Sequence, residues 1–175
     1  MGEIKSTLDL VMEKTRHLSL TEEEKDRQRE EEFEKRLQGL LQRCEDGFLS
    51  TDDFRGEVEA LQKELHRGDK PSPVKAVLGR IDPDGSNDRR LDLLRLYAPG
   101  AVEPLLKILS EYSDKKAELI REGARHQLEL LAKRGIQGTA VRPNLDREAR
   151  LTERVAGLNR EARERVQALP VSREL

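Results

Sequence analysis

Residues 21–65 decide the fold, and they read TEEEKDRQREEEFEKRLQGLLQRCEDGFLSTDDFRGEVEALQKEL. From Phe33 onward the apolar residues recur every three or four positions, which is the spacing of one face of an α-helix. They form two runs, Phe33, Leu37, Leu40, Leu41 and Cys44, then Phe54, Val58, Leu61 and Leu65. Because only a few residues around Gly47 separate the runs, we expect two helices packed as an antiparallel hairpin. Cys44 lies on the apolar face, where a buried thiol is expected rather than a reactive one.

The first of these helices has a clear start but nothing to bury along its first half. Thr21 stands three residues before Glu24, an arrangement in which each side chain bonds the backbone N–H of the other. Residues 22–32 then contain no apolar side chain and are dense in Glu, Lys and Arg. Ion pairs three or four residues apart favour a helix here. This segment therefore projects into solvent or contacts a partner.

Upstream, residues 3–17 predict a further amphipathic helix, because Ile4, Leu8, Val11 and Met12 share one helical face. Residues 1–67 thus form an N-terminal arm helix and a charged hairpin. Downstream, residues 68–100 predict a connecting region of short helices, interrupted by the turn-forming residues 82–88.

Residues 101–175 predict a long helix paired with the C-terminal helix. The long helix spans about 102–134, and a diluted stripe near Lys115 and Lys116, with Gly123 inside it, leaves a kink or a split open. Residues 135–144 lose helical periodicity, and we expect an extended loop lying across neighbouring helices. The C-terminal stripe consists of Leu151, Val155, Leu158, Ala162 and Leu169. Together these patterns predict an all-α fold, an elongated helical bundle.

The amino-acid composition excludes several classes of fold. Of the 175 residues, 39% are charged and only 3% are aromatic, so large α/β enzymes and β-sandwiches are not expected. The net charge of −2 conceals an asymmetry. Residues 1–67 hold 12 Lys+Arg and 18 Asp+Glu, a charge of −6, whereas residues 68–175 hold 21 and 17, a charge of +4. The two halves therefore attract each other, within one chain or between chains.

No motif predicts catalysis or a cofactor. Residues 82–88 alternate carboxylates and amides, but Asn87 stands where a calcium loop needs glycine, and Leu93 stands where it needs glutamate, so we expect a solvated turn. The pairs Glu13–His17 and Glu122–His126 are four residues apart, whereas a di-iron bundle uses Glu and His three residues apart and a zinc protease needs two histidines around a glutamate. We expect no enzyme, no cofactor and no metal, and keep a metal-binding bundle only as a second alternative.

A nucleic-acid role is the first alternative. Arg147, Arg150 and Arg154 lie at helical spacing in the C-terminal helix, and arginine binds phosphate well. However, acidic residues interleave with these arginines, and the segment has no aromatic residue for base stacking. Ion pairs within the helix are therefore the preferred interpretation.

The favoured hypothesis is a non-catalytic cytoplasmic protein that binds another protein or itself through helix faces. A single cysteine suits a reducing compartment, and apolar runs of a few residues exclude a membrane span. Five or six thin helices do not easily satisfy every apolar stripe within one chain, so we expect a homodimer. The expected contact elements are residues 22–32 and the stripe of Leu151, Val155, Leu158, Ala162 and Leu169.

Overall fold

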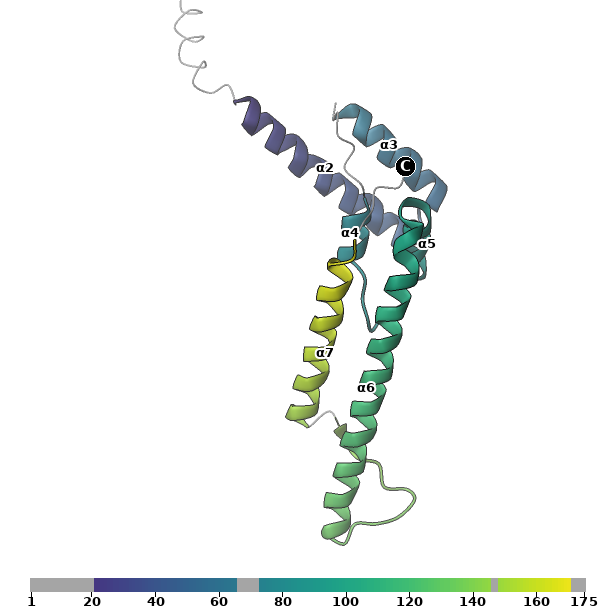
Figure 1. Ribbon diagram of the computed structural model, residues 1–175, viewed down its shortest axis with the longest axis vertical. Helices are drawn as coiled ribbons and strands as arrows, with labels where there is room; N and C mark the ends of the chain where they lie inside the picture. The colour runs from purple at the N-terminus through teal and green to yellow at the C-terminus, as the bar shows by residue number, and fades with distance from the viewer. Residues whose placement is uncertain (1–20, 66–72, 146–147, 171–175) are drawn as a thin grey trace, which may run out of the picture. The chain divides into compact units, whose positions relative to one another are not determined.

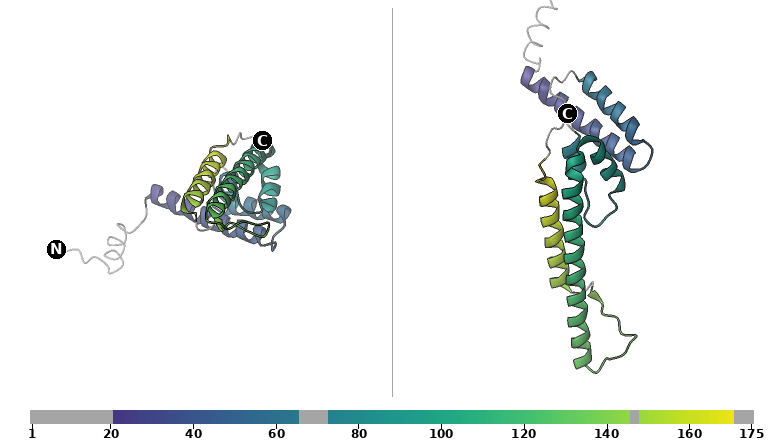
Figure 2. Two further views of the ribbon diagram at one scale, coloured as in Figure 1. Left: turned by 90° about the horizontal axis from the view of Figure 1, so that it is seen from below. Right: turned by 45° about the vertical axis from the view of Figure 1, so that its right-hand side comes forward.

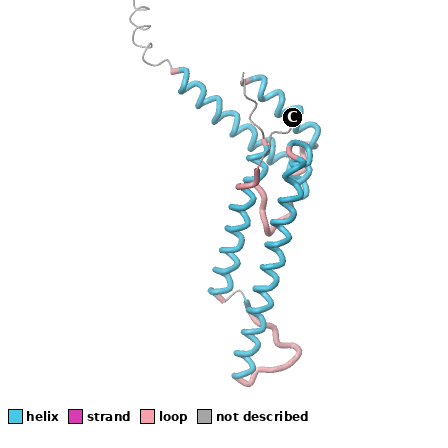
Figure 3. Tube along the Cα trace, viewed as in Figure 1, coloured by secondary structure: helices cyan, strands magenta, loops and turns pink. Residues whose placement is uncertain are grey.

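The computed structural model describes residues 21–65, 73–145 and 148–170, and within these ranges it contains six α-helices and no strand (Figures 1 and 3). The predicted all-α class is confirmed. The chain divides into two units, Met1–Pro71 and Ser72–Leu175. Residues 73–100, predicted as a connecting region, thus lie in the same unit as the long helix. The helix predicted over residues 3–17 lies outside the described residues.

The first unit contains the predicted hairpin, formed by α2 (Glu22–Glu45) and α3 (Thr51–Glu64). The capping box at Thr21 is present, since Glu24 N donates to Thr21 Oγ1 at 3.2 Å and Thr21 N donates to Glu24 Oε2 at 2.8 Å. The Cys44 thiol is buried, as predicted. All members of both predicted runs are buried, together with Leu49 between the helices: Phe33, Leu37, Leu40, Leu41, Cys44, Phe54, Val58, Leu61 and Leu65.

The first half of α2 is helical although nearly all of its side chains are exposed. Lys25 and Arg29 each pair with an acid three residues earlier, at 2.7 Å and 3.1 Å. Further along, Arg36 of α2 donates to Glu64 of α3 at 2.7 Å, and this hydrogen bond lowers the pKa of the Glu64 carboxyl. Ion pairs along the helix therefore support residues 22–32 where burial does not.

The second unit consists of α4 (Val74–Gly79), α5 (Asp88–Tyr97), α6 (Pro99–Lys133) and α7 (Ala149–Gln167). Helix α6 contacts α5 and α7, and α4 contacts α5 and α7. The views in Figures 1 and 2 agree that α7 lies alongside α6. Buried side chains from all four helices form the core, including Val77, Leu78, Leu93, Leu94, Leu105, Ile108 and Val166.

Helix α6 is one continuous helix of 35 residues, so the split into two helices considered at Gly123 does not occur. Gly123 is buried because α7 begins beside it. A Cβ atom added there would lie 2.9 Å from Leu151 Cδ2. The missing side chain thus allows α7 to approach α6 closely.

The loop after α6 does not follow the prediction. Ile136 is 49% exposed and Thr139 is also exposed, so the expectation that residues 135–144 lie across neighbouring helices is wrong for these two side chains. The backbone has a positive φ at Gly135 (77°) and Gly138 (147°). These two turns interrupt an extended path, and β-branched residues alone do not keep a segment against a helix surface.

We predict that Gly123→Leu lowers the free energy of unfolding by about 1–3 kcal/mol, because the added side chain pushes Leu151 and α7 away from α6. Urea denaturation followed by circular dichroism measures this change. Ala117→Leu is the matched control, since Ala117 is exposed on the same helix, and its effect stays within about 0.5 kcal/mol. Equal stability of the two variants would contradict close packing at Gly123.

Candidate functional site

The antiparallel hairpin of α6 and α7 carries the strongest candidate surface. Three side-chain contacts define its register: Arg154 lies beside Glu122, Asn159 beside Tyr112, and Arg165 beside Glu111. The residue numbers along α7 therefore increase as those of the contacting residues on α6 decrease, which means that the two helices are antiparallel. The Arg165–Glu111 pair, at 2.8 Å, lowers the pKa of the Glu111 carboxyl through the hydrogen bond from Arg165.

The predicted contact stripe of α7 lies along the line where the two helices meet. Leu151 and Ala162 are buried, whereas Val155, Leu158 and Leu169 are half-buried. Part of the stripe thus packs within the chain. The rest keeps an accessible apolar surface beside α6.

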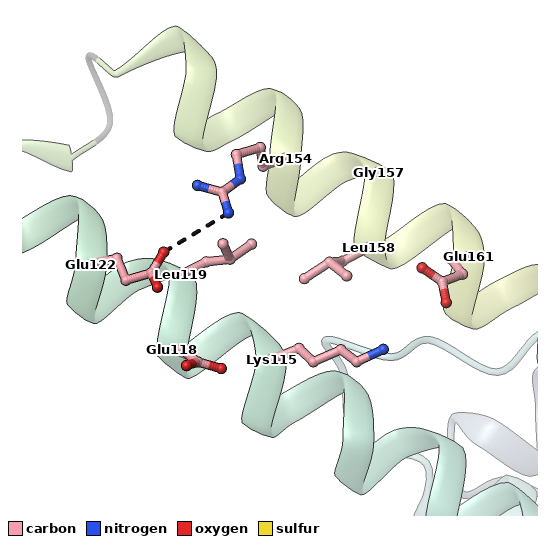
Figure 4. Close-up of a pocket in the computed structure, with 8 residues that line it drawn as sticks. All are labelled: Lys115, Glu118, Leu119, Glu122, Arg154, Gly157, Leu158 and Glu161. Carbon is pink, nitrogen blue, oxygen red and sulfur yellow. Dashed lines mark ion pairs between the residues drawn. The ribbon is translucent and has the colours of Figure 1, made fainter.

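An open groove of about 480 Å³ follows one side of this line (Figure 4). Leu119 and Leu158, both half-buried, point toward each other between the helices. Gly157 leaves the α7 backbone bare beside them, because nothing lies within 4 Å of where its Cβ would be. The remaining lining residues are charged and exposed: Lys115, Glu118, Glu122, Arg154 and Glu161.

The C-terminal half of α6 buries little of its own apolar surface. After Tyr112, the only buried residue of the helix is Gly123. Ile120 is 38% exposed and Leu128 is 40% exposed. Large apolar side chains that a core would normally enclose therefore remain within reach of another molecule.

The loop of residues 82–88 is fastened to both helices of the hairpin, which the sequence did not predict. Asp84 Oδ1 accepts hydrogen bonds from Tyr112 Oη at 2.6 Å and from Lys116 Nζ at 2.5 Å. Asp84 Oδ2 accepts a hydrogen bond from Asn159 Nδ2 of α7 at 2.8 Å. Arg163 NH2 donates to Asp82 Oδ1 at 3.0 Å. Residues 82–88 thus form a turn in which Asp84, Gly85, Ser86 and Asp88 are exposed, as predicted, and the turn also connects α6 with α7.

Asn87 holds the loop in the shape that these contacts need. Its side chain is 8% exposed, donates to Asp82 O at 2.8 Å and accepts from Asp82 N at 3.0 Å. A buried amide with both ends bonded closes the loop on itself. Asn87, which stands where a calcium-binding loop needs glycine, thus stabilises the structure of this loop.

The Asp84 cluster shifts the acidity of its members. Partial burial by itself raises the pKa of the Asp84 carboxyl, but hydrogen bonds from Lys116, Tyr112 and Asn159 outweigh burial and lower that pKa below its ordinary value of 3.8. The hydrogen bond to Asp84 raises the pKa of the Lys116 ammonium. Burial, followed by the bond to Asp84, raises the pKa of the Tyr112 hydroxyl. At neutral pH the cluster is therefore an ion pair with a neutral phenol.

The residues considered for metal binding and for nucleic-acid binding are not part of the Asp84 cluster. In the described ranges, no three His, Cys, Asp or Glu side chains come together as a metal site would require. Arg150 is exposed, Arg154 lies 3.9 Å from Glu122, and Arg147 lies outside the described residues. In the part of α7 that the structure describes, Arg154, Arg163 and Arg165 form ion pairs with α6 or with the loop of residues 82–88, and not with acids of α7 itself.

Comparison of the chain with sequence models of known families, with curated proteins and with solved structures found no match. Among the described helices, none has the length and apolar character that crossing a membrane requires. The function is therefore inferred from the surfaces of the chain itself.

We predict that Asp84→Ala lowers the free energy of unfolding by about 1–2 kcal/mol, because Lys116, Tyr112 and Asn159 lose their shared acceptor in a partly exposed site. Thermal or urea denaturation measures the loss. Asp114→Ala is the control, because it removes an exposed carboxylate from α6, the helix that carries Tyr112 and Lys116. We expect its effect on stability to be near zero. If both variants unfold alike, the cluster does not stabilise the hairpin.

We also predict that the advantage of the natural chain over Asp84→Asn disappears in acid. The folded pKa of Asp84 is lowered, so its stabilisation is present above the ordinary value of 3.8 and is lost as the pH falls through the folded pKa. Urea denaturation of both proteins at pH 6 and pH 3 checks this sign. A stability difference that grows toward pH 3 would contradict it.

Proposed function

We propose that this chain is a non-catalytic helical protein that binds other proteins and itself, and that it works as an adaptor in a reducing cytoplasm. The observation that carries the proposal is the groove of α6 and α7. Half-buried Leu119 and Leu158 lie within it, and charged side chains surround them. Apolar surface at the centre with charges around it is the usual composition of a protein interface.

The groove fits a helix better than a small ligand. The groove is open to solvent along its length, and the antiparallel helices α6 and α7 form its two walls, so it is not a closed pocket. Small-molecule sites are concave and bury most of the ligand. A helical partner would instead lay one apolar face over Leu119 and Leu158 while charges set its position.

A second exposed element supports an adaptor role. The first half of α2, residues 22–32, is a helix with seven Asp or Glu and three Lys or Arg, and nearly all of its side chains are exposed. This acidic surface suits a basic partner, and its recognition would depend on salt concentration. Two surfaces of different chemistry on one chain allow it to join different partners.

A non-catalytic role is supported by the Asp84 cluster, because hydrogen bonds and ion pairs within the chain already engage its carboxylates. Every side-chain oxygen of Asp84 accepts a hydrogen bond from within the chain, and Asp82 pairs with Arg163. These contacts account for the shifted pKa values without a substrate. The single cysteine is buried, which suits a structural thiol.

We predict that the natural chain dimerises with rising concentration and that Leu158→Asp makes it a monomer, because a carboxylate would replace the apolar centre of the groove. Sedimentation equilibrium measures the mass, and circular dichroism verifies that the variant is folded. Leu106→Asp is the control, since Leu106 is 44% exposed on α6 outside the groove, and it leaves the dimer intact. A natural chain that stays monomeric at every concentration would overturn self-association.

A further inference from the structure

We infer that the groove of α6 and α7 binds the same groove of a second copy, so that two hairpins form a four-helix assembly. This inference rests on the proposed self-association and specifies how it occurs. In this arrangement Lys115 of each copy faces Glu161 of the other, and Glu122 faces Arg154. The apolar centre of each groove covers the other.

The charges at the groove form a checkerboard. At one end Glu122 of α6 lies beside Arg154 of α7, 3.9 Å apart, and at the other end Lys115 of α6 lies near Glu161 of α7 (Figure 4). Each helix thus has one positive and one negative corner, in opposite order. All four side chains are exposed, so their charges are available to another molecule.

A checkerboard of this kind is complementary to its own copy. When two identical faces meet across a two-fold axis parallel to the helices, α6 of one copy lies over α7 of the other. Each corner residue of one copy then faces a residue of the other copy, namely the one that lies across the groove from it within its own chain. The two residues have opposite charges. Lys115 therefore meets Glu161, and Glu122 meets Arg154, in both halves of the assembly.

Glu118 distinguishes this arrangement from the second two-fold choice. An axis across the helices would also bring opposite corners together, but it would place α6 over α6 and the two Glu118 carboxylates near each other. Like charges facing each other are unfavourable. The axis parallel to the helices puts Glu118 over α7 of the other copy, and every helix is antiparallel to both of its neighbours, as in up-down four-helix bundles.

Gly157 provides the second observation for close contact. Glycine within a helix costs about 1 kcal/mol relative to alanine. Among the residues that the structure describes, nothing lies within 4 Å of a Cβ at this position, so packing among them does not require the glycine. A helix from another copy crossing Gly157 would use the space and approach the α7 backbone closely.

The available area fits a modest dimer. A 19-residue helix such as α7 is about 28 Å long, and two adjacent helices are about 20 Å wide. The shared face is then on the order of 550 Å² per copy, near the lower end of specific interfaces. Because area alone does not set affinity, we expect the charges at the four corners to decide whether a face of this size associates.

Two charge variants test the pairing. Lys115→Glu with Arg154→Glu makes all four corners negative, whereas Glu122→Lys with Glu161→Lys makes all four positive. Each variant alone should dimerise at least about tenfold more weakly than the natural chain, and an equimolar mixture should form a heterodimer. Sedimentation velocity of each variant and of the mixture, with circular dichroism of each, gives the result.

Arg121→Glu with Arg160→Glu is the matched control, because both arginines are exposed on the same two helices outside the groove and the net charge change is the same as in the first variant. This control should dimerise like the natural chain. If both corner variants dimerise as the natural chain does, another surface mediates self-association and only the present inference is overturned. If the folded variants are monomeric and do not combine, the checkerboard pairing is wrong. If the natural chain is itself a monomer, the proposed self-association is overturned as well.

Discussion

The register of α6 and α7 depends on the Asp84 carboxylate, which accepts hydrogen bonds from Tyr112 and Lys116 on one helix and from Asn159 on the other. Two helices held together by apolar contacts alone can slide past each other with little cost, whereas hydrogen bonds and ion pairs require defined positions. Asp84 lies in a loop that buried Asn87 closes through hydrogen bonds to Asp82, so contacts within the loop also hold Asp84 in place. The alignment of the groove follows from this contact.

Local signals predicted the helices of both hairpins, but not the loop contacts that join the helices of the second one. The capping box at Thr21 and the runs that begin at Phe33 and Phe54 involve residues that are close in sequence, so helical spacing suffices to locate them. The contacts of Asp84 lie 28, 32 and 75 residues away, and no local pattern encodes such distances. Local composition therefore predicts the turn at residues 82–88 but not its contacts with α6 and α7.

The contact stripe of α7 shows a second limit of sequence patterns. Helical spacing placed Leu151, Val155, Leu158, Ala162 and Leu169 on one face but did not indicate how much of that face α6 would cover. The structure buries Leu151 beside Gly123 and Ala162 further along α7, and leaves Leu158 between them half-buried. Which part of an apolar stripe remains accessible depends on the neighbouring helix, and that neighbour lies far away in sequence.

The pattern of charge matters more here than its sum. A net charge of −2 predicts neither attraction nor repulsion between copies. Within the groove, however, opposite charges occupy adjacent corners, so their fields cancel at a distance and act only on contact. A surface of this kind does not attract charged molecules in general, but it discriminates strongly among positions once a partner is close. The scarcity of aromatic anchors is consistent with this solution, since short-range charge pairing specifies register where large side chains are few.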